Sequence, residues 1–102
     1  MIWSNYLAGF FAGAFLANAV PHFVHGISGN KFPTPFATPR GVGLSPATTN
    51  VIWALFNIVV GYLLLRTGKV SQDDQLSLLV FFAGAAILSI LMSIRFQSKH
   101  TS

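Results

Sequence analysis

The chain has 102 residues, of which 53% are hydrophobic and only 8% charged, and its mean hydropathy is +0.64. Because a soluble domain carries about 25% charged residues, this composition indicates an integral membrane protein. Six Lys and Arg residues against two Asp residues give a net charge of +4. These charges are scattered singly and form no basic stripe, which excludes nucleic acid as a partner.

Three windows without charged residues, 1–30, 41–65 and 75–94, divide the sequence. A helix rises about 1.5 Å per residue, so about 20 apolar residues cross a hydrocarbon core of about 30 Å. Each window is long enough to do so. We therefore predict an all-α integral membrane protein with three transmembrane helices in a single domain over 1–102. A long Gly/Pro-rich loop is predicted between the first and second helices, and a tight hairpin between the second and third.

The first helix is predicted over about 4–25. Pro21 lacks a backbone N–H and its ring collides with the carbonyl of Ala17, so we expect a kink there. The residues from Ala17 to Ala19 have the small-x-small form of a signal-peptide cleavage site. No Lys or Arg precedes Lys31, however, so the positive region of a signal peptide is missing and an uncleaved helix is favoured.

A loop is predicted over 26–45, because this segment holds four glycines and three prolines. A loop of this length is uncommon in a compact protein and is usually either functional or disordered. Phe32, Phe36 and Leu44 interrupt it with apolar side chains. We therefore expect the loop to lie back on the helices or in the headgroup region.

The second helix is predicted over about 46–66, with Ser45 as its N-cap and Pro46 at its first helical position. Its end is indicated by Arg66 and by Gly68, a glycine suited to the left-handed C-terminal conformation.

The third helix is predicted over about 72–96. It opens with a capping-box pattern over 71–74, in which a serine hydroxyl and a carboxylate accept hydrogen bonds from the first N–H groups. The short connection after the second helix predicts that these two helices form an antiparallel hairpin.

Membrane orientation is read from Lys and Arg near the ends of the spans. The first loop and the C-terminal end together carry four (Lys31, Arg40, Arg95 and Lys99), and the opposite side carries two (Arg66 and Lys69). This bias predicts the N-terminus outside and the C-terminus inside. The absence of an Arg-rich, transit-like start favours a bacterial inner membrane over an organellar one.

Small residues mark the predicted contact faces, because helices in lipid associate through close approach of their backbones. Gly9 and Gly13 form a GxxxG motif that Ala17 extends by a turn, and Ala85 and Ser89 follow each other at i+4 on the third helix. The motif on the first helix is interpreted either as a seam between two copies of the chain or as a contact within one copy.

The second helix carries a narrow stripe of small and polar residues. Asn50, Ala54, Asn57 and Gly61 stand at offsets 0, 4, 7 and 11, which places them within about 60° of one another on a helix. Asn57 falls near the bilayer centre, where an unpaired amide is costly. Both asparagines are candidate ligand-binding residues, but for Asn57 a structural role between helices is favoured over a ligand or a solute path.

A second polar cluster is predicted near the end of the first helix. Asn18, His22 and His25 stand at offsets 0, 4 and 7 and point one way if the helix continues through Pro21. Histidine beside a membrane titrates near neutrality, binds metal or hydrogen-bonds a quinone or a lipid headgroup. Because the chain contains no Cys or Glu, we predict no metal site and no cofactor. The structural alternative is that the histidines bind loop carbonyls at the interface.

Lys31 and Arg40, in the first loop, complete the candidate ligand-binding set, because they present positive charge on the side of the histidines. No nucleotide-binding or nucleophile motif is present. The two acids, Asp73 and Asp74, are adjacent in one helix cap and form no catalytic pair. We therefore predict no catalytic residues and no enzymatic activity.

The expected function is that of a small integral membrane protein acting through helix–helix association. Its partners would be the lipid bilayer and either further copies of the chain, as a homo-oligomer, or a larger membrane protein to which it is an accessory subunit. Two alternatives stay open. One is a transporter or channel for a small neutral solute, and the other is a lipid-, quinone- or haem-binding protein that uses His22 and His25.

Overall fold

The structure, a computed structural model, describes residues 3–37, 43–71 and 74–97. It contains three helices, α1 (Trp3–Ile27), α2 (Ala47–Thr67) and α3 (Gln75–Gln97). Two short strands, β1 (Phe32–Pro33) and β2 (Leu44–Ser45), pair antiparallel between α1 and α2. All three helices are long and apolar enough to cross a membrane. The prediction of an all-α chain with three such helices is confirmed, and the fold is compatible with a multi-pass membrane protein.

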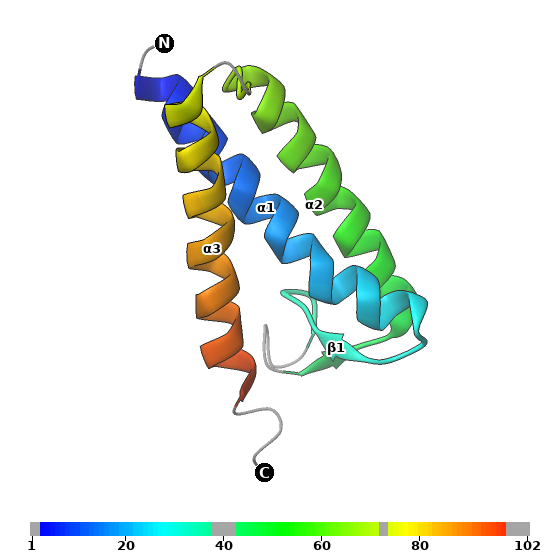
Figure 1. The fold of residues 1–102 in the computed structure, drawn as a ribbon. Coiled ribbons are helices and arrows are strands. Elements are labelled where there is room, and N and C mark those ends of the chain that lie inside the picture. The colour runs from blue at the N-terminus through cyan, green and yellow to red at the C-terminus, as the bar shows by residue number, and fades with distance from the viewer. Residues whose placement is uncertain (1–2, 38–42, 72–73, 98–102) are drawn as a thin grey trace.

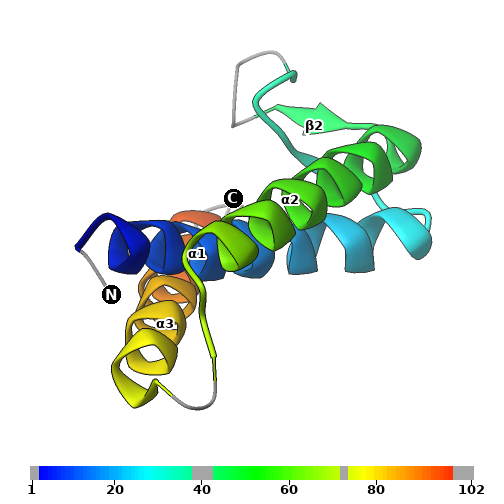
Figure 2. The same ribbon diagram turned by 90° about the horizontal axis from the view of Figure 1, so that it is seen from above.

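The first helix lies at the centre of the molecule. Both α2 and α3 pack against α1, and Figure 2 shows them on opposite sides of it. The predicted tight hairpin of α2 and α3 is not confirmed, because α1 lies between the two helices although their connection is short. The molecule extends 45 Å along its longest axis, comparable to a bilayer of about 40–45 Å with its headgroups.

Two glycines bring α1 and α3 into backbone contact. A Cβ atom built on Gly13 would meet the carbonyl oxygen of Phe81, and one built on Gly84 would meet the carbonyl oxygen of Phe10. No larger residue fits at either position without a shift of the backbone. Beyond this crossing the two helices diverge toward the C-terminal end of α3 (Figure 1).

The contact between α1 and α2 uses the small and polar stripe of α2. Its four residues (Asn50, Ala54, Asn57 and Gly61) are the buried residues of that helix. At the C-terminal end of α1, a Cβ on Gly26 would lie 2.9 Å from the backbone nitrogen of Val51 and 3.0 Å from the carbonyl oxygen of Ala47. Gly26 therefore belongs to the last turn of α1 and not to the predicted loop. The helix also continues through Pro21 to Ile27.

Two predicted ends of α2 are wrong in detail. The N-cap is Pro46, with no side-chain capping bond, because the hydroxyl of Ser45 pairs with that of Thr34 at 2.6 Å. Gly68 is not left-handed, since its φ is −75° and the positive φ of 53° falls on Lys69. Gly68 is needed for close approach instead, because a Cβ there would lie 2.8 Å from the carbonyl oxygen of Asn5.

The start of α3 lies one turn later than predicted. The helix begins at Gln75, and the carboxylate of Asp74 accepts a hydrogen bond from the backbone N–H of Ser77 at 3.3 Å. The Ser77 hydroxyl donates to the carbonyl oxygen of Asp74 at 2.7 Å. Asp74 thus caps the helix, whereas residues 72 and 73 of the predicted capping box lie outside the described residues.

The connection between α1 and α2 is partly packed on the helices. Phe32, Pro33 and Thr34 are buried, whereas Phe36 and Leu44 are 66% and 53% exposed. The ladder of β1 with β2 pairs Phe32 with Ser45 and holds the two ends of the connection together. This segment closes one side of the space between α1 and α3.

Candidate binding site

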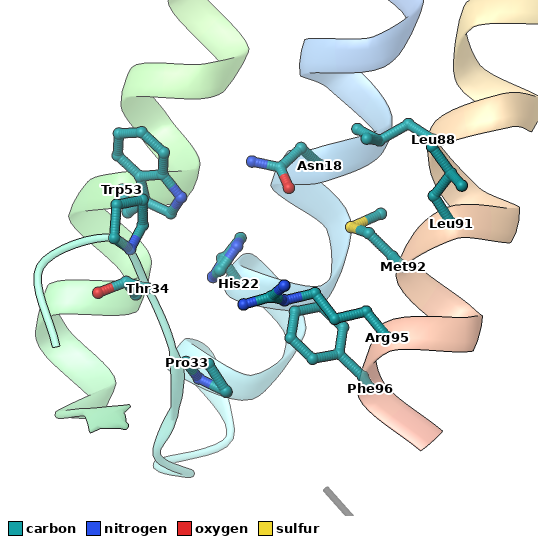
Figure 3. Close-up of a pocket in the computed structure, with 11 residues that line it drawn as sticks. Asn18, His22, Pro33, Thr34, Trp53, Leu88, Leu91, Met92, Arg95 and Phe96 are labelled. Carbon is teal, nitrogen blue, oxygen red and sulfur yellow. The ribbon is translucent and has the colours of Figure 1, made fainter. Parts of the chain in front are cut away.

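A cavity of about 330 Å³ opens where α3 diverges from α1. Its walls come from all three helices and from the segment after β1 (Figure 3). We call this cavity the cleft. The lining residues that carry polar groups are Asn18, His22, Thr34, Trp53 and Arg95, and the apolar lining residues of α3 are Leu88, Leu91, Met92 and Phe96. The volume lies at the lower end of the range of small-molecule sites, about 300–1,000 Å³.

A second cavity continues the cleft toward the middle of the helices. It has a volume of about 300 Å³ and shares Asn18, Trp53 and Leu88 with the cleft. Ala14 and Phe15 add apolar surface to it. We call it the inner pocket. Together the two cavities form an elongated space, in which the amides, the imidazole and the indole come from α1 and α2 and the aliphatic side chains Leu88, Leu91 and Met92 come from α3.

The ring of His22 is held by the amide of Asn50. The Nδ2 atom of Asn50 donates to the carbonyl oxygens of Phe32 and Ser45 at 3.0 and 3.2 Å. The Oδ1 atom is therefore the one that faces His22, and it lies 2.8 Å from the Nδ1 atom of that ring. An acceptor at this distance requires a proton on Nδ1. In the neutral ring Nε2 is then the acceptor.

The amide of Asn18 is held by Asn57 in the same way. Asn57 donates through Nδ2 to the carbonyl oxygen of Trp53 at 2.8 Å, and its Oδ1 atom accepts from Nδ2 of Asn18 at 3.1 Å. These bonds join α1 to α2 and satisfy the buried amide of Asn57. Among the described residues no hydrogen bond uses the Oδ1 atom of Asn18, which leaves an acceptor at the wall shared by the cleft and the inner pocket.

Trp53 contributes a hydrogen-bond donor to the same region. Its indole N–H is buried and has no acceptor within the described part of the chain. The ring lies across the cavity from Leu88 and Leu91, with its nitrogen edge on the side of Asn18 and His22 (Figure 3). A buried donor without a partner costs about 1–3 kcal/mol, so an acceptor supplied by a ligand would be stabilised here.

Arg95 is the charged residue among those lining the cleft. It comes from the last turn of α3 and extends across the opening toward His22 (Figure 3). Leu88, Leu91 and Met92 precede it by seven, four and three positions, so they share a helix face with it, and Phe96 follows it directly. The cleft thus has a cation at its mouth, hydrogen-bonding groups along one wall and aliphatic side chains along the other.

The structure divides the predicted cluster of Asn18, His22 and His25. Asn18 and His22 line the cleft, whereas His25 lines a different cavity, of about 550 Å³, between α1 and α3. His25 stacks on the ring of Phe32, with centroids 4.4 Å apart and an interplanar angle of 14°. His22 meets the same ring edge-on at 5.3 Å. Phe32 therefore contacts both imidazoles.

The other predicted ligand-binding residues do not line the cleft. Lys31 is exposed in the connection, and Arg40 lies outside the described residues. Asn50 is fully buried, with its amide engaged between His22 and the backbone of the connection. Asn57 lines the inner pocket. No three His, Cys, Asp or Glu side chains come together as a metal site in the described ranges.

The predicted packing residues differ in burial. Gly13, Ala54 and Gly61 are buried between helices of the same chain, and Gly9 is buried against Val70 in the connection that follows α2. Three others are less enclosed: Ala17 and Ala85 are half-buried, and Ser89 is exposed. The GxxxG motif of α1 is therefore used within one copy of the chain.

Sequence reasoning missed Trp53 and Arg95 as site residues. Trp53 lies three positions after Asn50 and four before Asn57, so the polar stripe already pointed to its neighbourhood. Arg95 was used only for membrane orientation. Its spacing from the aliphatic residues of α3 was visible, but the sequence did not show which helix this face approaches.

No protein-family model, curated protein or solved structure matches the chain. The function is therefore argued from the chemistry of the cleft.

Proposed function

We propose that this chain is a small multi-pass membrane protein that binds a lipid-like amphiphile in the cleft. The observation that carries the proposal is the division of the cleft walls. The indole N–H of Trp53 and the Oδ1 atom of Asn18 lie on one side, and Leu88 and Leu91 lie on the other. An amphiphile pairs its polar atoms with the first wall and its hydrocarbon chain with the second.

The positions of the small residues support this proposal over the other two hypotheses. Helix–helix association, as a homo-oligomer or an accessory subunit, was inferred from Gly9, Gly13 and the stripe of α2, all of which make contacts within one copy of the chain. A solute path between protomers was inferred from the same stripe, which lies against α1. Both hypotheses stay predictions, but these residues no longer favour them.

The cleft lies at the end of the molecule that carries the first connection and the end of α3 (Figure 1). The Lys and Arg bias of the sequence favours this end on the cytoplasmic side of a bacterial inner membrane, with the N-terminus outside. In that orientation the cleft opens toward the cytoplasmic leaflet.

Native mass spectrometry of the detergent-solubilised protein tests the proposal. We expect a retained adduct with the mass of a membrane lipid. In the variant Leu88→Trp, the larger side chain fills the wall common to the cleft and the inner pocket, so we expect the adduct to be lost.

The matched control is Leu79→Trp. Leu79 lies on the same helix and is 67% exposed, so this substitution adds the same group outside the cavities. It should leave the adduct in place. A wild-type protein that carries no adduct, or equal retention by both variants, would contradict the proposed function.

A further inference from the structure

The polar groups of the cleft lie at two depths. Arg95 is in the last turn of α3, which ends at Gln97, whereas Trp53 is six residues inside α2, which begins at Ala47. At about 1.5 Å per residue these positions are about 3 Å and about 9 Å from the helix ends. Trp53 lines both the cleft and the inner pocket, whereas Arg95 lines the cleft alone, so the cation is at the mouth of the cleft and the indole lies deeper.

The charge at the mouth of the cleft comes from Arg95, the charged residue of its lining. The acid that the structure describes, Asp74, lies in the connection between α2 and α3, at the opposite end of the molecule from Arg95. An Arg side chain near a membrane interface often reaches outward to headgroups. Here it extends across the cleft toward His22 (Figure 3), which places its guanidinium over the opening.

Guanidinium groups bind phosphate through paired charge-assisted hydrogen bonds. An indole N–H donates to a neutral acceptor such as an ester carbonyl. Beyond Trp53, the inner pocket offers Ala14, Phe15 and Leu88, which suit a hydrocarbon chain. The order along the cavity is thus a cation, a neutral donor and then apolar surface.

We infer that the cleft binds a phospholipid with an anionic headgroup, which rests on the proposed function. Its phosphate is held by Arg95, an ester carbonyl accepts from the indole N–H of Trp53, and one acyl chain lies between α1 and α3 along the inner pocket. The three parts of the lipid follow one another in the same order as the three groups of the cavity.

The test is a competition between phosphatidylglycerol and phosphatidylcholine of equal acyl chains, offered in equal amounts to the solubilised protein. Both lipids have a phosphate, but the choline group carries a positive charge that the guanidinium of Arg95 repels. Native mass spectrometry measures the ratio of the two adducts. We expect phosphatidylglycerol to be favoured about tenfold, the scale of one charge-assisted contact.

Four variants test the parts of the inference separately. Arg95→Gln should bring the ratio close to one while lipid is still retained, and Arg95→Lys should keep most of the preference. Lys31→Gln removes the same charge from an exposed site outside the cleft and should leave the ratio unchanged. Trp53→Phe should lower the retention of both lipids about equally, because the donor is lost and the ring is kept.

The possible results distinguish a failure of the anionic headgroup site from a failure of the proposed lipid binding. Retention without headgroup preference, or an equal effect of Lys31→Gln and Arg95→Gln, would overturn the anionic site and leave the proposed function standing. If millimolar inorganic phosphate displaced the lipid, the site would be one for a free anion, and the inference would be overturned. Absence of any lipid adduct would overturn the proposed function itself.

Discussion

Asn50 joins three parts of the chain through one side chain. It contacts His22 of α1 at 2.8 Å and donates to the carbonyl oxygens of Phe32 in β1 and Ser45 in β2. Since its side chain is fully buried, water does not replace these partners when one of them is removed. Asn50 therefore holds the connection against the helices and orients the ring of His22 at the cleft.

We predict that Asn50→Ala lowers the free energy of unfolding by about 1–3 kcal/mol, the cost of leaving buried groups without partners. Denaturant titration in detergent micelles measures the change. Thr48→Ala, at an exposed position of the same helix, is the control and should change stability little. Equal stability of the two variants would show that the contacts of Asn50 contribute nothing.

Substitution of Asn57 is predicted to lower the stability less than substitution of Asn50. Its contacts are one bond to Asn18 and one to the carbonyl oxygen of Trp53, and such interhelical amide bonds contribute about 0.5–2 kcal/mol in membranes. We expect Asn57→Leu to reduce stability by this amount while the protein still folds. If Asn57→Leu left stability intact but abolished solute permeation into liposomes, the path hypothesis would be favoured over a structural role.

Among the helices, the crossing of α1 and α3 depends on two glycines. Since a Cβ at Gly84 would meet the carbonyl oxygen of Phe10, which is backbone, the neighbour cannot move aside as a flexible side chain does. The crossing fixes where α3 leaves α1 and therefore where the cleft opens.

We predict that Gly84→Ala destabilises the protein by about 1–3 kcal/mol through overpacking, despite the better helix propensity of alanine. It should also reduce lipid retention, because α3 forms the apolar wall of the cleft. Ala86→Leu, at an exposed position of α3, is the control. A Gly84→Ala protein as stable as the wild type, with its lipid retained, would contradict the close crossing.

For the whole molecule, the first prediction concerns orientation. The chain has no cysteine, so single-cysteine variants report exposure without a background signal. In right-side-out vesicles, whose outer face is the outer face of the cell membrane, we expect an impermeant maleimide to label Thr67→Cys. Ser28→Cys, at the end of the cleft, should react only after permeabilisation. Both positions are exposed, and the reverse pattern would place the N-terminus inside.

The second prediction for the whole molecule concerns its association with further copies of the chain or with a larger protein. If helix–helix association is the function, gentle release from the membrane should yield masses at integer multiples of 11.0 kDa or a mixed complex with a larger protein. A single copy of the chain with a lipid adduct would contradict that hypothesis and agree with the cleft as the functional site.

The sequence by itself determined the elements and one packing face. Charge-free windows and capping residues predicted three helices within one turn of their positions, and the spacing of Asn50, Ala54, Asn57 and Gly61 placed them on one face of α2. These features depend on helix length and periodicity, which are local properties of the chain.

Only the tertiary structure decided which helix lies in the centre and what surrounds the cleft. The separation of His25 from His22, the role of Gly68 in close approach and the meeting of Trp53 with Arg95 all depend on contacts between distant segments. In an apolar chain every helix face suits lipid or protein, so the pattern of hydrophobic residues does not select the neighbours. Backbone contact at small residues and the pairing of buried amides select them instead.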